Sequence, residues 1–179
     1  MRIAVVLNDV QTGHSNIWIF DASGKSSRQL TFNPAIDSSP EWSPDGTSIV
    51  FASNLAGHAD LYQIASDGSG EQQVLLKSDQ DKYPTSWSKD GILLYGSVDS
   101  KTHEDLWALR MQSGEKPVPF LRSEFREANG VFSPDGRWIA YVSNESGAFE
   151  IWVRPFSMEK GEQSATGLRW LASKGGGIS

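Results

Sequence analysis

The sequence contains no cysteine, which excludes disulfide bonds and thiolate metal ligands but leaves the compartment open. It also lacks a basic excess, because 16 Lys and Arg residues stand against 22 Asp and Glu residues, a formal net charge of −6. A chain of this charge is poorly suited to nucleic acid or to an anionic membrane surface. We therefore expect neither as a partner.

Long apolar runs are missing too. Near the start, Ile3–Leu7 is shorter than the core of a signal peptide, and no cleavage pattern follows it. No segment approaches the roughly 20 apolar residues of a transmembrane helix. No stretch of ten or more residues has apolar spacing at three and four, so long helices are not expected either.

What the chain does contain is a repeat. Pro40–Gly46 (PEWSPDG) returns as Pro84–Gly91 (PTSWSKDG) and as Val131–Gly136 (VFSPDG), and the three final glycines stand 45 residues apart. Pro fixes φ, Asp can bond its own backbone, and Gly accepts a positive φ, so each copy predicts an aromatic strand end that runs into a tight turn. A period of this length is typical of propellers and solenoids.

Further repeating strands follow each turn. A second strand is predicted at Thr47–Ser53, Ile92–Ser97 and Arg137–Ser143. We align Ala4–Leu7 with Ile49–Ala52, so the first copy lacks its aromatic leading strand. A third strand begins with an acid or amide, then a branched aliphatic residue and a large aromatic one, at Asn16–Trp18, Asp60–Tyr62, Asp105–Trp107 and Glu150–Trp152. Fourth strands are predicted at Arg28–Thr31, Gln73–Leu76, Pro117–Leu121 and Leu168–Leu171, after Gly-bearing turns that include Lys160-Gly161.

Such four-stranded meanders bury their faces by packing around an axis, so the predicted fold is an all-β propeller. We expect four four-stranded antiparallel blades of about 45 residues, circularly shifted and incomplete at the termini. The predicted units are approximately 1–31, 32–76, 77–121 and 122–171, with 172–179 as the start of a next unit. The repeat-locked aromatic residues should pack between blades; they are Trp18, Trp42, Tyr62, Trp87, Trp107, Phe132 and Trp152.

Two features of the repeat carry a resemblance to a known family. The Trp-Ser-Pro-Asp-Gly turn at Trp42–Gly46 is followed by a strand that ends Ala-Ser-Asn at Asn54 or Val-Ser-Asn at Asn144, then a Gly and Ile/Leu-Tyr/Trp. This pattern resembles the TolB-type propeller repeat, a distant relative of WD repeats, over essentially the whole chain. Phe149–Phe156 and Gly175–Ser179 are similar to propeller tails of bacterial serine/threonine kinases and winged-helix regulators.

The resemblance implies a fold more strongly than a function. The same repeat occurs in periplasmic TolB, in propellers that gate prolyl-oligopeptidase-like peptidases, and in sensor-like tails of kinases. It implies an extracytoplasmic location. In such tails another Trp-x-x-Asp-Gly strand follows the Gly-rich segment, so we interpret the chain as a piece, or a minimal relative, of a larger propeller that could pair with a second copy through its open edges.

Catalytic motifs are not found. No Gly-x-Ser-x-Gly elbow is present, and Gly24-Lys25-Ser26 imitates a phosphate loop but has Ile19 where the first Gly belongs. Kinase catalytic-loop and metal-binding motifs are also missing. The sequence therefore predicts a protein that is not an enzyme and that needs no cofactor.

The histidines occupy equivalent positions just before the third strand: His14, His58 and His103. Because equivalent loops of adjacent blades should lie well over 10 Å apart, we expect no shared metal site, and loop histidines that bond to a neighbouring turn are the favoured interpretation. His103-Glu104 begins like a zinc-protease motif but has no second histidine.

A second equivalent position lies eight residues before each turn aspartate, at Asp37, Lys82 and Glu127. It should lie in the loop that leads into the first strand of a blade, on the same rim as the loops after the second strands. The predicted binding rim is therefore Asp37, Asp81, Lys82, Arg126, Glu127, His14, His58 and His103. Plain solvated loop charge is the more conservative interpretation, and Asp45, Asp90 and Asp135 at the opposite end are expected to be structural.

Two functions remain open. One is a non-catalytic scaffold that binds a protein partner or a small polar ligand through the rim. The other is an accessory or sensor propeller of a larger enzyme, a serine/threonine kinase or a prolyl-oligopeptidase-like peptidase, whose catalytic domain lies outside this sequence.

Overall fold

The fold is all-β. The computed structural model describes residues 1–158, 168–173 and 175–176, and within these ranges the chain forms strands and turns but no helix. No helix of the described residues could therefore cross a membrane. The predicted Lys160-Gly161 turn and the last three residues lie outside the described residues.

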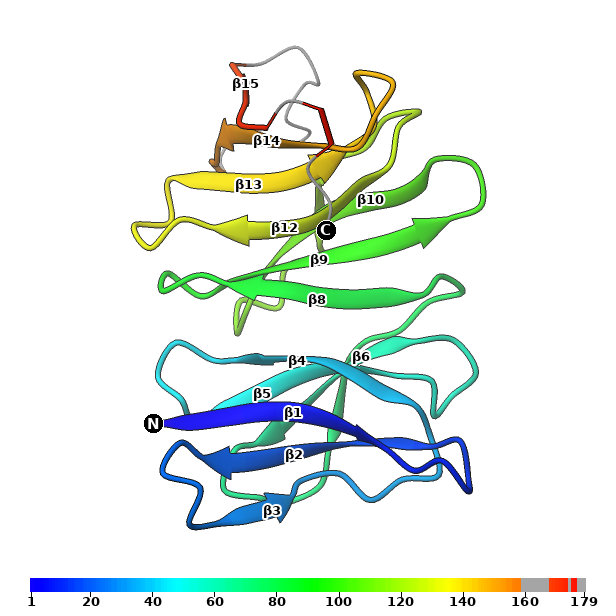
Figure 1. The fold of residues 1–179 in the computed structure, drawn as a ribbon, viewed down its shortest axis with the longest axis vertical. Helices are drawn as coiled ribbons and strands as arrows, with labels where there is room; N and C mark the ends of the chain where they lie inside the picture. The colour runs from blue at the N-terminus through cyan, green and yellow to red at the C-terminus, as the bar shows by residue number, and fades with distance from the viewer. Residues whose placement is uncertain (159–167, 174, 177–179) are drawn as a thin grey trace. The chain divides into compact units, whose positions relative to one another are not determined.

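The strands assemble into four antiparallel sheets in sequence order (Figure 1). The first sheet has the order β1-β2-β3, and the others are β4-β5-β6-β7, β11-β10-β9-β8 and β12-β13-β14-β15. The strand bounds are β1 (Arg2–Asn8), β2 (Ser15–Asp21), β3 (Ser27–Gln29), β4 (Asp37–Trp42), β5 (Ser48–Ser53), β6 (Asp60–Ala65), β7 (Gln73–Leu76), β8 (Lys82–Trp87), β9 (Ile92–Asp99), β10 (His103–Arg110), β11 (Val118–Leu121), β12 (Glu127–Phe132), β13 (Trp138–Ser143), β14 (Glu150–Pro155) and β15 (Trp170–Leu171).

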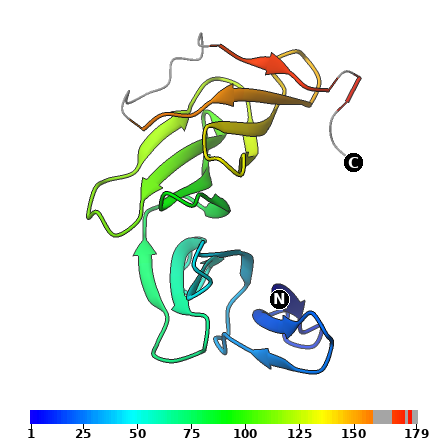
Figure 2. The same cartoon turned by 90° about the vertical axis from the view of Figure 1, so that its left-hand side faces the viewer.

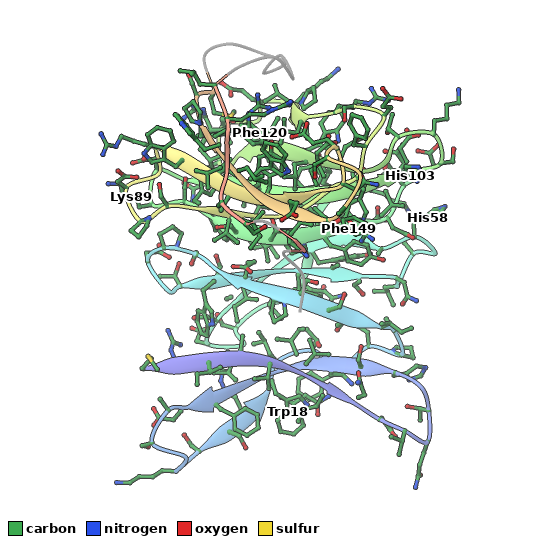
Figure 3. The ribbon with its side chains drawn as sticks, turned by 45° about the horizontal axis from the view of Figure 1, so that its top comes forward. Trp18, His58, Lys89, His103, Phe120 and Phe149 are labelled. Atoms are coloured by element: carbon green, nitrogen blue, oxygen red, sulfur yellow. The ribbon has the colours of Figure 1, made fainter. Side chains whose placement is uncertain are left out.

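The sheets fall into two compact units. The first unit is Met1–Pro84 and the second is Thr85–Ser179. In the first unit, Ile17 and Ile19 of β2 pack with Phe51 and Tyr62 of the second sheet, and Trp42 packs against this cluster. In the second unit, described separately, the core joins residues of β9–β11 to Ile139 and Tyr141 of β13, with Phe132 and Trp152 packed against it; Phe120, labelled in Figure 3, belongs to this cluster. Of the seven repeat-locked aromatic residues, four thus pack in or against these cores as predicted: Trp42, Tyr62, Phe132 and Trp152. Trp18, Trp87 and Trp107 belong to neither cluster.

The Asp-Gly turns are held by the aspartate hydrogen bonds and the positive φ at glycine that the sequence predicted. Ser43 Oγ donates to Asp45 Oδ1 at 2.6 Å, and the same carboxyl oxygen accepts from the Thr47 backbone N–H at 3.0 Å. Gly46 has a φ of 70°, a left-handed conformation that only glycine adopts at little cost. The turn at Ser133–Gly136 repeats both the Ser–Asp bond and the positive φ.

Two details differ from the expectation. The first sheet has three strands, so the meander that lacks its leading strand is real, but Trp18 pairs with Val5 and Tyr62 with Phe51. Val5, rather than Val6, therefore corresponds to Phe51, so the sequence alignment of Ala4–Leu7 was wrong by one residue; 12 residues lie between Val5 and Trp18 but 10 between Phe51 and Tyr62. The predicted fourth strand Leu168–Leu171 is only the two residues of β15, which pairs with β14 beside it (Figure 2).

Candidate functional site

The predicted rim residues lie at one end of their sheets. Asp37 at the start of β4 pairs with Ser53 at the end of β5, which in turn pairs with Asp60 at the start of β6. Glu127, Ser143 and Glu150 make the same row across β12, β13 and β14. The Asp-Gly turns lie at the other end, and Figure 3 shows this for the second unit, where Lys89 and His103 lie at opposite sides.

The structure divides the predicted rim into a buried group and an exposed group. Asp37, Lys82 and Glu127 were expected in a solvated loop, and that expectation is wrong: each is the first residue of a strand and is 0%, 3% and 5% exposed, respectively. Strand pairing places Asp37 in one row with Asp60 and Glu127 in one row with Glu150, and the Lys82 backbone N–H donates to the Ala59 carbonyl at 2.7 Å. We call these three residues and their partners the buried joints.

The joint at Lys82 is an ion pair. Its Nζ lies 3.3 Å from Asp60 Oδ1, with both side chains almost fully buried, and also donates to the Gln80 carbonyl at 2.6 Å. Asp60 Oδ1 accepts a further bond from the Ser78 backbone N–H at 3.0 Å. Because Asp60 starts β6 and Lys82 starts β8, this pair connects the second sheet to the strand that opens the third.

The joint at Asp37 has no cation paired with it among the residues that the structure describes. Burial raises the pKa of the Asp37 carboxyl, and the hydroxyls of Ser53 and Thr31 lower it less strongly. Thr31 Oγ1 in turn accepts from the Ile17 backbone N–H at 2.9 Å. This joint therefore places Asp37 among hydroxyl groups between the first and second sheets, where burial disfavours its charged form.

The joint at Glu127 contains two acids. The pKa of Glu127 is raised to about 7, mainly by burial and also by the negative charges of Asp105 and Glu145, whereas the hydrogen bond from Ser123 opposes the rise. Burial also raises the pKa of Asp105, although Thr102 Oγ1 donates to it at 2.6 Å and Arg122 Nε lies 3.6 Å away. The joint thus favours at least one protonated carboxyl near neutral pH.

A fourth joint surrounds Glu150, which is 5% exposed. Its carboxylate accepts bonds from the backbone N–H groups of Gly175 and Gly176 at 2.8 and 3.1 Å and from the Ser173 hydroxyl, and these bonds lower its pKa. The acid or amide that begins each third strand was visible in the repeat, but its role as half of a joint was not predicted. The signal was present, since that position recurs in all four copies.

The exposed group of the first unit is centred on His58. Its Nδ1 lies 3.4 Å from Asp81 Oδ1, and the two side chains are 56% and 42% exposed. The same Asp81 oxygen accepts from the Ala59 backbone N–H at 2.8 Å, which holds the loop before β6. His14, in the loop before β2, is half-buried, and its backbone N–H donates to Thr12.

The exposed group of the second unit contains His103 and Arg126. His103 is exposed and has a φ of 69°, uncommon for a residue with a side chain. Arg126 Nη2 lies 2.8 Å from Glu104 Oε2, and the guanidinium lies 6.0 Å from the Phe149 ring centroid. In the described part of the chain, no group of three or more His, Asp or Glu side chains has a spacing that could hold a metal ion.

The first unit also contains a groove of about 530 Å³. Leu30, Tyr62 and Ile64 are its buried lining residues, whereas Phe32 is 75% exposed. Asn33 Nδ2 donates to Gln72 Oε1 at 2.6 Å beside it. A groove of this volume is within the range of small-molecule sites.

The chain was compared with known proteins. The family model of the TolB beta propeller domain matches residues 1–153. An uncharacterized peptidase YuxL of Bacillus subtilis is 25% identical over 167 residues, which cover 73% of this chain and 25% of that protein. The Tol-Pal system protein TolB of Bordetella pertussis is 44% identical over 55 residues, 30% of this chain and 13% of that protein.

Solved structures give the same fold. TolB from Acinetobacter baumannii aligns with a TM-score of 0.73 at 21% identity, over 88% of this chain and 39% of that one. A putative TolB from Agrobacterium tumefaciens aligns with a TM-score of 0.71 at 23% identity, over 85% and 54% of the two chains.

The chain spans a quarter or less of the two curated relatives named above and about half or less of these structures. Sheets in sequence order, the Asp-Gly turns, the aromatic residues between sheets and the match over residues 1–153 agree on one assignment. The chain belongs to the TolB β-propeller family.

Proposed function

We propose that this propeller is a non-catalytic binding scaffold, and that the end of the sheets that carries the exposed group binds a protein or a small polar ligand. The observation that carries the proposal is the division of the rim. The buried joints fix the strand starts, and the loops above them present His58, Asp81, His103 and Arg126 to solvent. Polar loops on a rigid sheet scaffold are a common arrangement for binding.

The test changes exposed residues only. The Arg126→Glu and His58→Ala variants alter exposed side chains, and we expect each to reduce recovery of a partner bound by the wild-type protein on a matrix. Capture is quantified by mass spectrometry from the extract of the source cells. If every specifically captured protein is recovered equally by both variants, the rim proposal is wrong.

A matched control uses the opposite end of the sheets. Arg137→Glu changes charge in the same way as Arg126→Glu, at a side chain that is 78% exposed in an Asp-Gly turn. We expect this variant to capture partners as the wild type does. Asp37, Lys82 and Glu127 remain unchanged, because altering a buried joint would test folding rather than binding.

A second candidate function is supported by the peptidase relatives. YuxL matches 73% of the chain, and a puromycin-hydrolyzing peptidase of Mycobacterium tuberculosis aligns with a TM-score of 0.68 over 90% of it. In this alternative the propeller is an accessory or sensor domain of a peptidase or a kinase. The coding sequence on both sides decides: a hydrolase domain with a Gly-x-Ser-x-Gly motif, or a kinase domain, supports it, and a stop codon with a separate promoter on each side contradicts it.

We also propose that the repeats run at about 1–31, 32–76, 77–121 and 122–171, with 172–179 opening a next unit, and that the isolated chain associates with a second copy. Two features support association. β1 is the edge strand of a three-stranded sheet, with Ile3 and Leu7 45% and 42% exposed. Trp138 and Trp170 form an edge-to-face pair with their ring centroids 5.2 Å apart, and the two residues are 36% and 46% exposed.

A further inference from the structure

Two arginines of the first sheet both bond to the turn that follows β6, and one of them also bonds to the Asp-Gly turn at Gly46. Arg2 Nη1 donates to Ser66 Oγ at 3.3 Å and its Nη2 to the Gly46 carbonyl at 2.8 Å. Arg28 Nη1 donates to the Asp67 carbonyl at 2.6 Å, and its Nη2 donates to the Ser66 carbonyl. The two guanidinium groups are therefore held in fixed positions by backbone and hydroxyl oxygens within the first unit.

The repeat shows that the fold does not need arginine at these positions. In the strand pairing, Arg2 lies opposite Asp21, the third residue after Trp18. Arg28 lies opposite Ile19, the first residue after Trp18. By the same registers, Ser48, Ile92 and Trp138 stand in the place of Arg2. Gln73, Val118 and Trp170 stand in the place of Arg28. Two cations thus replace neutral residues at facing positions in one sheet only.

A cavity of about 140 Å³ lies between these arginines. Its lining is Arg2, Ile19, Asp21, Ser26, Ser27 and Arg28. At about 30 Å³ per water, this volume holds four or five water molecules or one group of the size of a phosphate. Among residues 1–158, the hydroxyls of Ser26 and Ser27 have no hydrogen-bond partner, and Lys25 precedes them in the turn.

Donors remain for a ligand. A guanidinium has five N–H groups, and the four bonds above leave about three on each arginine. Asp21 opposes an anion, but its Oδ1 is already engaged by the Ser23 hydroxyl and backbone N–H, which lower its pKa. Asp67 also lies near Arg28 and has a lowered pKa, with its carboxyl bound to Ser69. The local balance is thus two guanidinium groups and a lysine against two carboxylates that are bound elsewhere.

We propose that this Arg2–Arg28 cavity binds a phosphate group. Paired guanidinium groups fit the oxygens of phosphate, and seryl hydroxyls supply further donors. The site is independent of the rim, since it is built at the end of the first sheet where β1 begins and β2 ends. A bound phosphate would connect β1, the β2–β3 turn and, through the two arginines, the turn at Ser66.

The test is a titration of the whole chain with inorganic phosphate, O-phosphoserine and acetate, read by NMR at the arginine Nε–H groups and the Ser26 and Ser27 amides. Sodium chloride at matched ionic strength is the reference. We expect saturable shifts at these groups with phosphate and weaker ones with acetate. If phosphoserine binds as tightly as phosphate, the site takes phosphate monoesters; if it does not, the site takes the free ion.

Two variants change the affinity in opposite directions without touching either arginine. Asp21→Asn removes the opposing charge and should tighten phosphate binding by about tenfold, whereas Ser26→Glu should weaken it by about tenfold or more. Glu115→Gln and Ser146→Glu make the same charge changes at exposed sites of the second unit and should leave the affinity unchanged. The amide spectrum of each variant reports its fold. Shifts that sodium chloride reproduces, acetate binding as tight as phosphate binding, or variants of Asp21 and Ser26 that behave as their controls do would each overturn the proposal.

Discussion

At the scale of single residues, the buried joints show how one repeat position carries different chemistry. The first residue of β4, β8 and β12 is Asp37, Lys82 and Glu127 in turn, and all are buried. The charge of Lys82 is paired with Asp60, and the Asp37 carboxyl lies beside the hydroxyls of Ser53 and Thr31. Glu127 has a pKa raised to about 7, so its carboxyl is protonated more readily than an exposed one. A position that varies this freely in sequence looks like a solvated loop, which is why its burial was not predicted.

Glu127 should make stability depend on pH. Its pKa is about 7 in the folded chain against an ordinary value of 4.5, so the folded state binds more protons between these values. Stability therefore falls as pH rises from about 4.5 to about 7, by roughly 3 kcal/mol for this group alone. In Glu127→Gln, urea denaturation at pH 5, 6, 7 and 8 should show a smaller fall than in the wild type.

The matched control for this prediction is Glu115→Gln, at a side chain that is 60% exposed. It should leave the pH profile of stability unchanged. A profile of Glu127→Gln that superimposes on the wild-type profile would show that Glu127 is ionised without penalty in the folded protein.

Removing one partner of the buried Lys82–Asp60 pair should strongly lower the free energy of unfolding. Lys82→Met leaves the Asp60 carboxylate buried without its cation, and we expect a loss of about 3–5 kcal/mol in the free energy of unfolding. Adding Asp60→Asn should restore part of that loss, because the uncompensated charge is then gone. Urea denaturation of the two single variants and the double variant measures the coupling; strictly additive effects would contradict it.

At the scale of elements, the Asp-Gly turn determines how each first strand turns back into the second. The carboxylate of Asp45 accepts bonds from Ser43 and Thr47, and Gly46, Gly91 and Gly136 all have φ between 70° and 76°. These turns were predictable from the sequence because their residues act locally. The bulges between Ser38 and Glu41 and between Ala128 and Val131 were not, since they depend on how β4 and β12 pair with their neighbours.

Substitutions of Gly91 allow the energetic cost of a positive φ in the turn to be measured by itself. Its φ is 76°, and a Cβ there would meet no other atom within 4 Å, so Gly91→Ala adds backbone strain without a clash. We expect Gly91→Ala to lower the free energy of unfolding by about 1–2 kcal/mol. Gly91→Asn should cost less, because asparagine tolerates the left-handed region better. Equal losses in the two variants, measured by thermal unfolding, would argue against the conformational explanation.

At the scale of the whole molecule, apolar surface that the sheets do not cover should drive association. Trp138 and Trp170 are exposed in the second unit, beside Leu168 and Leu171, which are 73% and 40% exposed. We expect the wild-type chain to associate as its concentration rises and the Trp138→Ser, Trp170→Ser double variant to remain monomeric over the same range, as measured by sedimentation velocity.

A control for this prediction is Val10→Ser, at a loop residue that is 94% exposed and belongs to no aromatic pair. It should associate as the wild type does. A wild-type chain that sediments as a monomer at every concentration would contradict the proposal of a second copy.

The sequence by itself determined what acts locally or repeats: the period of the strands, the turn glycines and the aromatic positions, whose spacing alone places them on a sheet face. Only the tertiary structure decided which polar residues are buried and which are exposed. Asp37, Lys82 and Glu127 are buried because strand pairing and the neighbouring sheet cover them, whereas His58 and Arg126 remain in solvent. Arg2 and Arg28 are 26 residues apart in the sequence, and only the pairing of β1 and β3 on either side of β2 brings their guanidinium groups to one turn.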